Sequence, residues 1–133
     1  MLIGRAAGYA NMTSAADGTI AIGYYALTAL TSGAGNLAIG FRAMLTHTTG
    51  SRNMGIGYGA MNGTDGDADD APASVDNIFI GLDAGGGDWV NNAASNYNVG
   101  VGNGTMDGAM DGALGNTAVG FAALGDITGG DSN

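Results

Sequence analysis

The sequence predicts an all-β protein, a β-solenoid (β-roll) of about seven coils with 17–24 residues in each coil. The first observation behind this fold is a recurring phrase: asparagine, apolar, small, apolar, glycine and an aromatic residue. The second is its spacing, because a phrase that returns about once per coil indicates a stack of similar units. The third is composition. Of 133 residues 27 are glycine without a Gly-X-Y period, and 45% are hydrophobic with only 11% charged, which excludes collagen and a typical disordered chain.

Each copy of the phrase contains a short strand that ends at a glycine. These glycines are separated by 19, 17, 17, 24, 21 and 18 residues, and they are Gly4, Gly23, Gly40, Gly57, Gly81, Gly102 and Gly120. Before the glycine, two apolar residues flank a small one, a period-two pattern typical of a strand with one buried face. We expect the small residue to face away from the interior. The apolar residues next to the glycine then form an aliphatic ladder inside the solenoid, at Ile22, Ile39, Ile56, Ile80, Val101 and Val119.

After the glycine the chain turns, and a polar stretch leads into the next copy. Glycine suits this corner because it turns without steric cost. The residue that opens most copies is asparagine, at Asn36, Asn53, Asn77, Asn98 and Asn116. Asparagine tolerates left-handed backbone and bonds locally, so we expect a turn residue here and a hydrogen-bonded ladder across the stacked coils. No apolar pattern of period 3.6 predicts a helix.

The charge of the chain disfavours two classes of partner. Three arginines, no lysine and twelve acidic residues give a formal net charge of −9, which repels nucleic acids and anionic membranes. No apolar run approaches the length of a membrane span, about 20 residues. The lack of cysteine excludes disulfides, thiol catalysis and cysteine zinc sites. An acidic, lysine-free surface fits an extracellular or virion protein, and no nucleophile or phosphate-loop motif indicates an enzyme.

The phrase resembles the repeats of two kinds of fibrous protein. Residues 116–124, 19–27 and 36–44 are similar to the Asn-Thr-Ala-(Ile/Val)-Gly-(Tyr/Phe)-x-Ala-Leu repeat of phage tail fibres, and the phrase is also similar to the Ser-Val-Ala-Ile-Gly repeat in head domains of trimeric autotransporter adhesins. Weaker copies extend the resemblance over nearly the whole chain. It implies a β-roll, usually packed as a parallel trimer, in a fibre or an adhesin. Two copies depart from the pattern, with Leu82 and Asn103 at the aromatic position.

Residues 1–133 are expected to form a single repeat domain. The last residue, Asn133, falls on the opening position of a further coil. We therefore expect either a segment of a longer fibre or a homo-oligomer whose subunits stack head to tail; a boundary that respects the period by chance is the alternative. The expected function is a structural subunit or shaft segment of an extracellular or viral fibre. An adhesin that binds carbohydrate or a cell-surface receptor is the alternative.

Two longer coils, residues 63–97, are expected to form one lateral protrusion that carries any specificity. Within it, Asp65, Asp67 and Asp69 alternate as at the start of a calcium loop. The full EF-hand spacing is missing, so a solvated acidic loop is the other interpretation.

The only tryptophan of the chain follows in the next coil. Trp89 stands close to Asp88, Asn91 and Asn92. These four residues predict a site for surface glycans, in which the indole stacks on a sugar. In the other interpretation, Trp89 folds back and covers the core of the longer coils.

Sequons for N-linked glycans begin at Asn11, Asn62 and Asn103. We expect glycosylation there if the host has the machinery, although a chain rich in asparagine, glycine and threonine also produces sequons by chance. His47 lies in a polar turn without a second ligand at a suitable spacing, and it is expected to be solvated.

Overall fold

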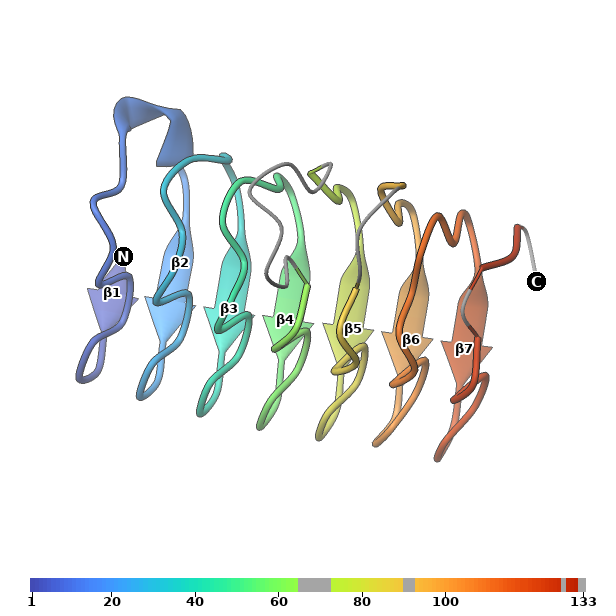
Figure 1. Ribbon diagram of the computed structural model, residues 1–133. Helices are drawn as coiled ribbons and strands as arrows, with labels where there is room; N and C mark the ends of the chain where they lie inside the picture. Colours follow the sequence, from blue (N-terminus) through green and yellow to red (C-terminus); the bar gives the residue numbers. More distant parts are fainter. Residues whose placement is uncertain (65–72, 90–92, 128, 132–133) are drawn as a thin grey trace.

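Seven short parallel strands form one sheet that runs the length of the molecule (Figure 1). The computed structural model describes residues 1–64, 73–89, 93–127 and 129–131. The strands are β1 (Leu2–Ile3), β2 (Ile20–Ile22), β3 (Leu37–Ile39), β4 (Met54–Ile56), β5 (Ile78–Ile80), β6 (Val99–Val101) and β7 (Thr117–Val119). Each strand pairs with the next one along the chain. The prediction of an all-β solenoid is therefore confirmed.

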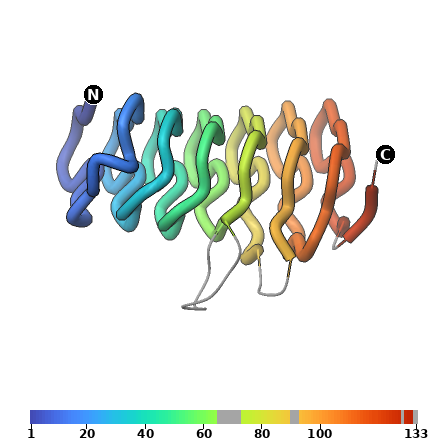
Figure 2. Tube along the Cα trace, turned by 90° about the horizontal axis from the view of Figure 1, so that it is seen from above, coloured from blue at the N-terminus to red at the C-terminus, as the bar shows by residue number. Residues whose placement is uncertain are grey.

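The coils follow one another along a single axis from the N-terminal to the C-terminal end (Figure 2). Equivalent residues of neighbouring coils pair directly: Ala21 with Ala38, and Ala38 with Gly55. This register continues to β7, so every position of the phrase forms a row along the rod. The only helix among the described residues is one 3-10 turn, η1 (Ser14–Ala16), whose Ala15 amide is capped by the Thr13 hydroxyl at 3.3 Å.

A glycine with positive φ ends each strand and forms the corner of each coil. At these seven corner glycines φ lies between 125° and 145°, a region that L side chains avoid. A Cβ at Gly57 would also collide with the carbonyl oxygen of Gly81 in the next coil. Both the turn and the close stacking of coils therefore require glycine here.

The small middle residue of each strand points into the solenoid, and the apolar residues on both sides of it point out. Ala21, Ala38 and Phe79 are fully buried. The predicted interior ladder is therefore wrong, because its members are only partly buried or exposed: Ile22, Ile39, Ile56, Ile80, Val101 and Val119. A coil of about 17 residues is narrow, and large side chains from the opposite wall leave room only for small ones on the strand.

Those large side chains come from the turn after the corner glycine. Leu27, Met44, Met61 and Met106 are fully buried, and all four have left-handed backbone with φ between 47° and 53°. Left-handed backbone costs roughly 1–2 kcal/mol per residue, and full burial of such a side chain contributes about 1.5–3 kcal/mol. Burial therefore offsets the cost of the unusual turn.

In the coil of β5 the large side chain comes from the strand and the small residue from the turn. In β5 the inward residue is Phe79, and Gly85 takes the place that Leu27 or Met44 has in other coils. A Cβ at Gly100, the inward residue of β6, would lie only 2.6 Å from the Phe79 ring. The phenyl ring thus fills space left by two glycines, so the departure from the phrase is compensated within the core.

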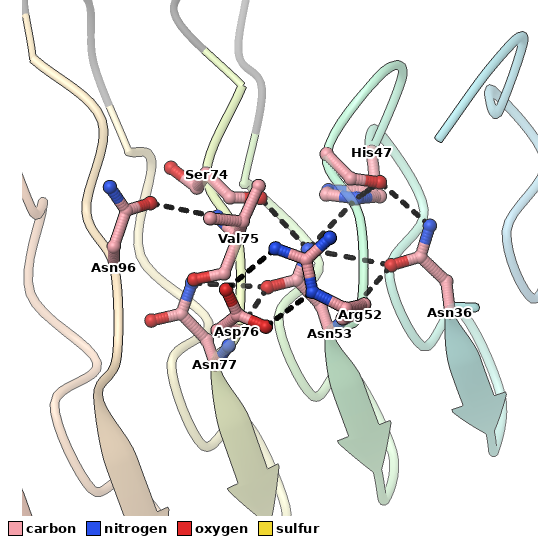
Figure 3. A network of polar contacts seen from close by, with 10 residues as sticks. Asn36, His47, Arg52, Asn53, Ser74, Val75, Asp76, Asn77 and Asn96 are labelled. Atoms are coloured by element: carbon pink, nitrogen blue, oxygen red, sulfur yellow. Dashed lines mark hydrogen bonds and ion pairs between the residues drawn. The ribbon is translucent and has the colours of Figure 1, made fainter. Parts of the chain in front are cut away.

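A column of buried asparagines stacks beside the sheet, as expected (Figure 3). The Asn77 side-chain amide donates to Asn53 Oδ1 at 3.1 Å, and the backbone N–H of Asn77 donates to the same oxygen at 3.1 Å. The same pair of bonds joins the other neighbours of the asparagine column, which comprises Asn36, Asn53, Asn77, Asn98 and Asn116. The left-handed residue is the one before each asparagine, such as Arg52 with φ 57°, and not the asparagine itself.

Candidate functional site

The outward side chains of the strands form a continuous surface that is apolar except at Thr117, here called the outer face. It contains one row from the first residue of each strand and one from the third. The rows are Ile20, Leu37, Met54, Ile78, Val99 and Thr117, and Ile3, Ile22, Ile39, Ile56, Ile80, Val101 and Val119. No member is charged, and exposed fractions reach 37% at Ile80 and 72% at Val119. Such a surface on a strongly acidic chain is the most unusual feature of the rod.

An aromatic row borders the outer face just beyond the corner glycines. The rings of Tyr24 and Phe41 stack with centroids 5.4 Å apart, and those of Phe41 and Tyr58 with centroids 4.9 Å apart. The Arg42 guanidinium carbon lies 5.2 Å from the centre of the Phe41 ring, close enough for a cation–π contact. A side-chain hydrogen bond with Tyr25 raises the pKa of Tyr24 above its ordinary value.

The opposite border of the outer face carries an ion pair. Arg52 donates from Nε to Asp76 Oδ1 at 2.6 Å and from its terminal nitrogen to Oδ2 at 2.8 Å, linking two coils (Figure 3). These hydrogen bonds and the positive charge of Arg52 hold the pKa of Asp76 below its usual value. Both residues are left-handed and precede a column asparagine, so the pair fixes this turn from outside.

Charge is divided unevenly along the rod. Residues 1–64 contain all three arginines and a single acidic residue, Asp17. Residues 65–133 contain the other eleven acidic residues and no arginine or lysine. Arg42 and Asp83 occupy equivalent places, each the second residue after its corner glycine. The two halves of one border of the outer face thus differ in sign.

The predicted glycan site around Trp89 is not formed by an exposed indole. Trp89 is only 3% exposed, its indole N–H donates to the Gly85 carbonyl at 3.1 Å, and its ring packs edge-on against Phe79 with centroids 5.6 Å apart. The interpretation that Trp89 covers the core is confirmed, and stacking of this ring on a sugar is excluded by its burial. Asp88 is exposed, and Asn91 and Asn92 lie outside the described residues.

The predicted calcium ligands Asp65, Asp67 and Asp69 also lie outside the described residues, so calcium binding stays a prediction. Within the described part of the chain, no group of three or more His, Cys, Asp or Glu residues is placed to hold a metal ion.

The three sequons differ in accessibility. Asn11 is exposed together with Thr13, whereas the threonines that complete the other two sequons, Thr64 and Thr105, are buried. Asn62 is half-buried and Asn103 is exposed. The sequon at Asn11 is therefore the one whose recognition residues all face solvent.

His47 is buried, and the expectation of a solvated side chain is wrong. Its Nδ1 lies 2.9 Å from Thr64 Oγ1 and its Nε2 lies 3.1 Å from the Gly50 carbonyl oxygen. Nε2 also lies 3.3 Å from the Asn53 side-chain amide nitrogen, beside the asparagine column (Figure 3). Comparison of equivalent positions in neighbouring coils would have predicted this burial. His47 lies as far beyond its corner glycine as the buried Leu30 does in the preceding coil. This histidine belongs to the core.

Among the residues described, no helix is long and apolar enough to cross a membrane. Comparison with protein families, with curated proteins and with solved structures finds no match to this chain, so the resemblance of its phrase to fibre and adhesin repeats stays a prediction.

Proposed function

We propose that this protein is a structural rod, a subunit or shaft segment of an extracellular or virion fibre, which associates with further copies of itself through the outer face. The observation that carries the proposal is the outer face, two uncharged apolar rows that run along the whole sheet. The resemblance of the repeat phrase to tail-fibre and adhesin repeats supports the setting. A catalytic role has no comparable support from the side chains described.

The size of the outer face favours a protein partner. Seven strands about 4.8 Å apart give a surface roughly 29 Å long. Contiguous apolar patches larger than a few hundred Å² are rare on monomeric proteins and mark interaction sites. The outer face is contiguous along all seven strands, and burying it removes apolar side chains from water at about 25 cal/mol per Å².

A second copy is the occupant that fits best. The rows are straight and evenly spaced, so the ridges of one copy match the grooves of another, as in stacked sheets about 10 Å apart. Because the outer face carries no charge, two copies can associate through it while their acidic surfaces stay apart. An isologous contact of this type closes on itself and gives a defined particle.

End-to-end stacking of coils, which does not close on itself, is proposed beside lateral association as the contact that extends a fibre. β1 and β7 are the two edge strands of the described sheet, and edge strands pair readily with a further chain.

Analytical ultracentrifugation of the purified chain tests lateral association. We expect a concentration-dependent dimer or larger particle for the native chain and a shift to monomer for Ile56→Asp, which places a charge in the middle of the outer face. Tyr9→Ser is the matched control, because Tyr9 is 78% exposed and lies outside the outer face. A native chain that stays monomeric at high concentration would contradict the proposal.

A further inference from the structure

We propose that the second copy on the outer face lies antiparallel, with the two rod axes in opposite directions and Arg42 of each copy beside Asp83 of the other. This inference rests on the proposed function, because it names the orientation in which that face takes its partner. It is carried by the charges that border the face.

A twofold axis along the strand direction at β4 produces this arrangement. It places β4 over β4, β3 over β5 and β2 over β6 of the partner copy, and it keeps the borders beyond the corner glycines on the same side. Arg42 follows β3 and Asp83 follows β5, each as the second residue after the corner glycine. The symmetry therefore brings the two side chains together twice in each dimer.

The parallel arrangement gives the opposite electrostatics. A twofold axis along the rod places the border after the corner glycines over the border before the asparagines, coil by coil. Asp83 then approaches Asp76 of the same coil in the partner, a carboxylate already paired with Arg52, while Arg42 meets Gly35, so the Arg42–Asp83 pairs are lost. Like charges at an interface border are unfavourable and opposite charges fix the register.

The charge of the whole rod favours the same orientation. In the described coils beyond residue 72 there are seven aspartates and no arginine or lysine, whereas residues 1–64 carry three arginines and one aspartate. Parallel packing sets the acidic coils of both copies side by side, and antiparallel packing sets them against coils of opposite net charge. Border charges act within the Debye length of about 8 Å at physiological salt, so the Arg42–Asp83 pairs dominate.

Cysteine cross-linking tests the orientation, because the native chain contains no cysteine. We mix Ile22→Cys and Val101→Cys variants and treat them with a short bis-maleimide. The antiparallel pair predicts a 22–101 cross-link between different variants and no 22–22 or 101–101 product. The parallel pair predicts the reverse.

A charge swap tests the proposed contact independently of cross-linking. Arg42→Asp or Asp83→Arg alone is expected to weaken self-association at least about tenfold, because each dimer contains the pair twice, and the double variant is expected to recover the native dissociation constant within about threefold. Circular dichroism of each variant checks the fold.

The outcomes separate this inference from the function on which it rests. A 22–101 cross-link together with rescue by the double variant supports the antiparallel pair. Associated particles that give 22–22 and 101–101 products overturn the orientation and leave the rod proposal intact. A chain that remains monomeric overturns both.

Discussion

Replacing one asparagine in the middle of the column should destabilise the rod far more than its size suggests. The Asn77 side-chain oxygen accepts from the Asn98 backbone N–H at 3.0 Å and from its side-chain amide at 3.1 Å. The Asn77 amide in turn donates to Asn53 Oδ1 at 3.1 Å and to the Ser95 carbonyl at 2.8 Å. Asn77→Ala removes these bonds while their partners remain inside the stack.

The expected loss of stability follows from the buried polar groups that are left without a hydrogen-bond partner. The Asn98 amide and the Ser95 carbonyl lose these partners in a buried setting, and each unsatisfied buried group costs about 1–3 kcal/mol. We therefore expect Asn77→Ala to lower the free energy of unfolding by about 3–5 kcal/mol, which for a domain of this size is a fall in melting temperature of about 10–20 °C.

The assay is thermal and urea unfolding followed by circular dichroism, with Asn103→Ala as the matched control. Asn103 is exposed and its side chain accepts one bond, from the Leu82 amide at 3.0 Å, so its removal should cost under about 1 kcal/mol. If both variants unfold within about 1 kcal/mol of each other, the column is not the stabilising element described here.

The asparagine column, the aromatic core and the surface ion pair each offer a further test. The buried Thr19 hydroxyl has no hydrogen-bond partner among the described residues, so Thr19→Asn should extend the column and stabilise the fold by about 1–2 kcal/mol; an unchanged urea midpoint would contradict this. Phe79→Ala and Gly100→Ala should each destabilise, by about 3–5 and 1–3 kcal/mol, and a double-mutant cycle should show partial mutual rescue rather than additivity. Arg52→Ala should raise the pKa of Asp76 in an NMR titration; because the native pKa is lowered, the pair stabilises above the normal carboxyl pKa, and this contribution disappears as pH falls through the lowered value.

The architecture could be predicted from the sequence because one phrase specifies both the strand and its corner. The glycine that ends each strand is required by backbone φ and by the approach of the next coil, as at Gly57. The asparagine column was also predictable, since a buried amide that repeats once per coil satisfies itself in a stack. Both features depend on the number of residues between equivalent glycines and asparagines, which can be counted in the sequence.

The direction of the strand side chains could not be predicted from spacing. Alternation at period two shows that two faces differ, but it does not show which face is interior. Apolar size pointed to Ile39 as the core residue, whereas the core takes Ala38 because Met44 from the opposite wall already fills the coil. For the same reason the outer face could not be recognised from the sequence, because its apolar residues are the ones that size alone places in the interior. Trp89 and His47 were harder because their burial depends on partners in other coils.

Adjacent substitutions in one strand test the central claim most directly. Ala38 is fully buried and its neighbour Ile39 belongs to the outer face. Ala38→Asp and Ile39→Asp introduce the same charge one residue apart, and each variant is measured by circular dichroism and by sedimentation. Our account predicts that Ala38→Asp unfolds, whereas Ile39→Asp keeps the β signal and sediments as a monomer. A folded Ala38→Asp together with an unfolded Ile39→Asp would show that the aliphatic ladder is the core after all.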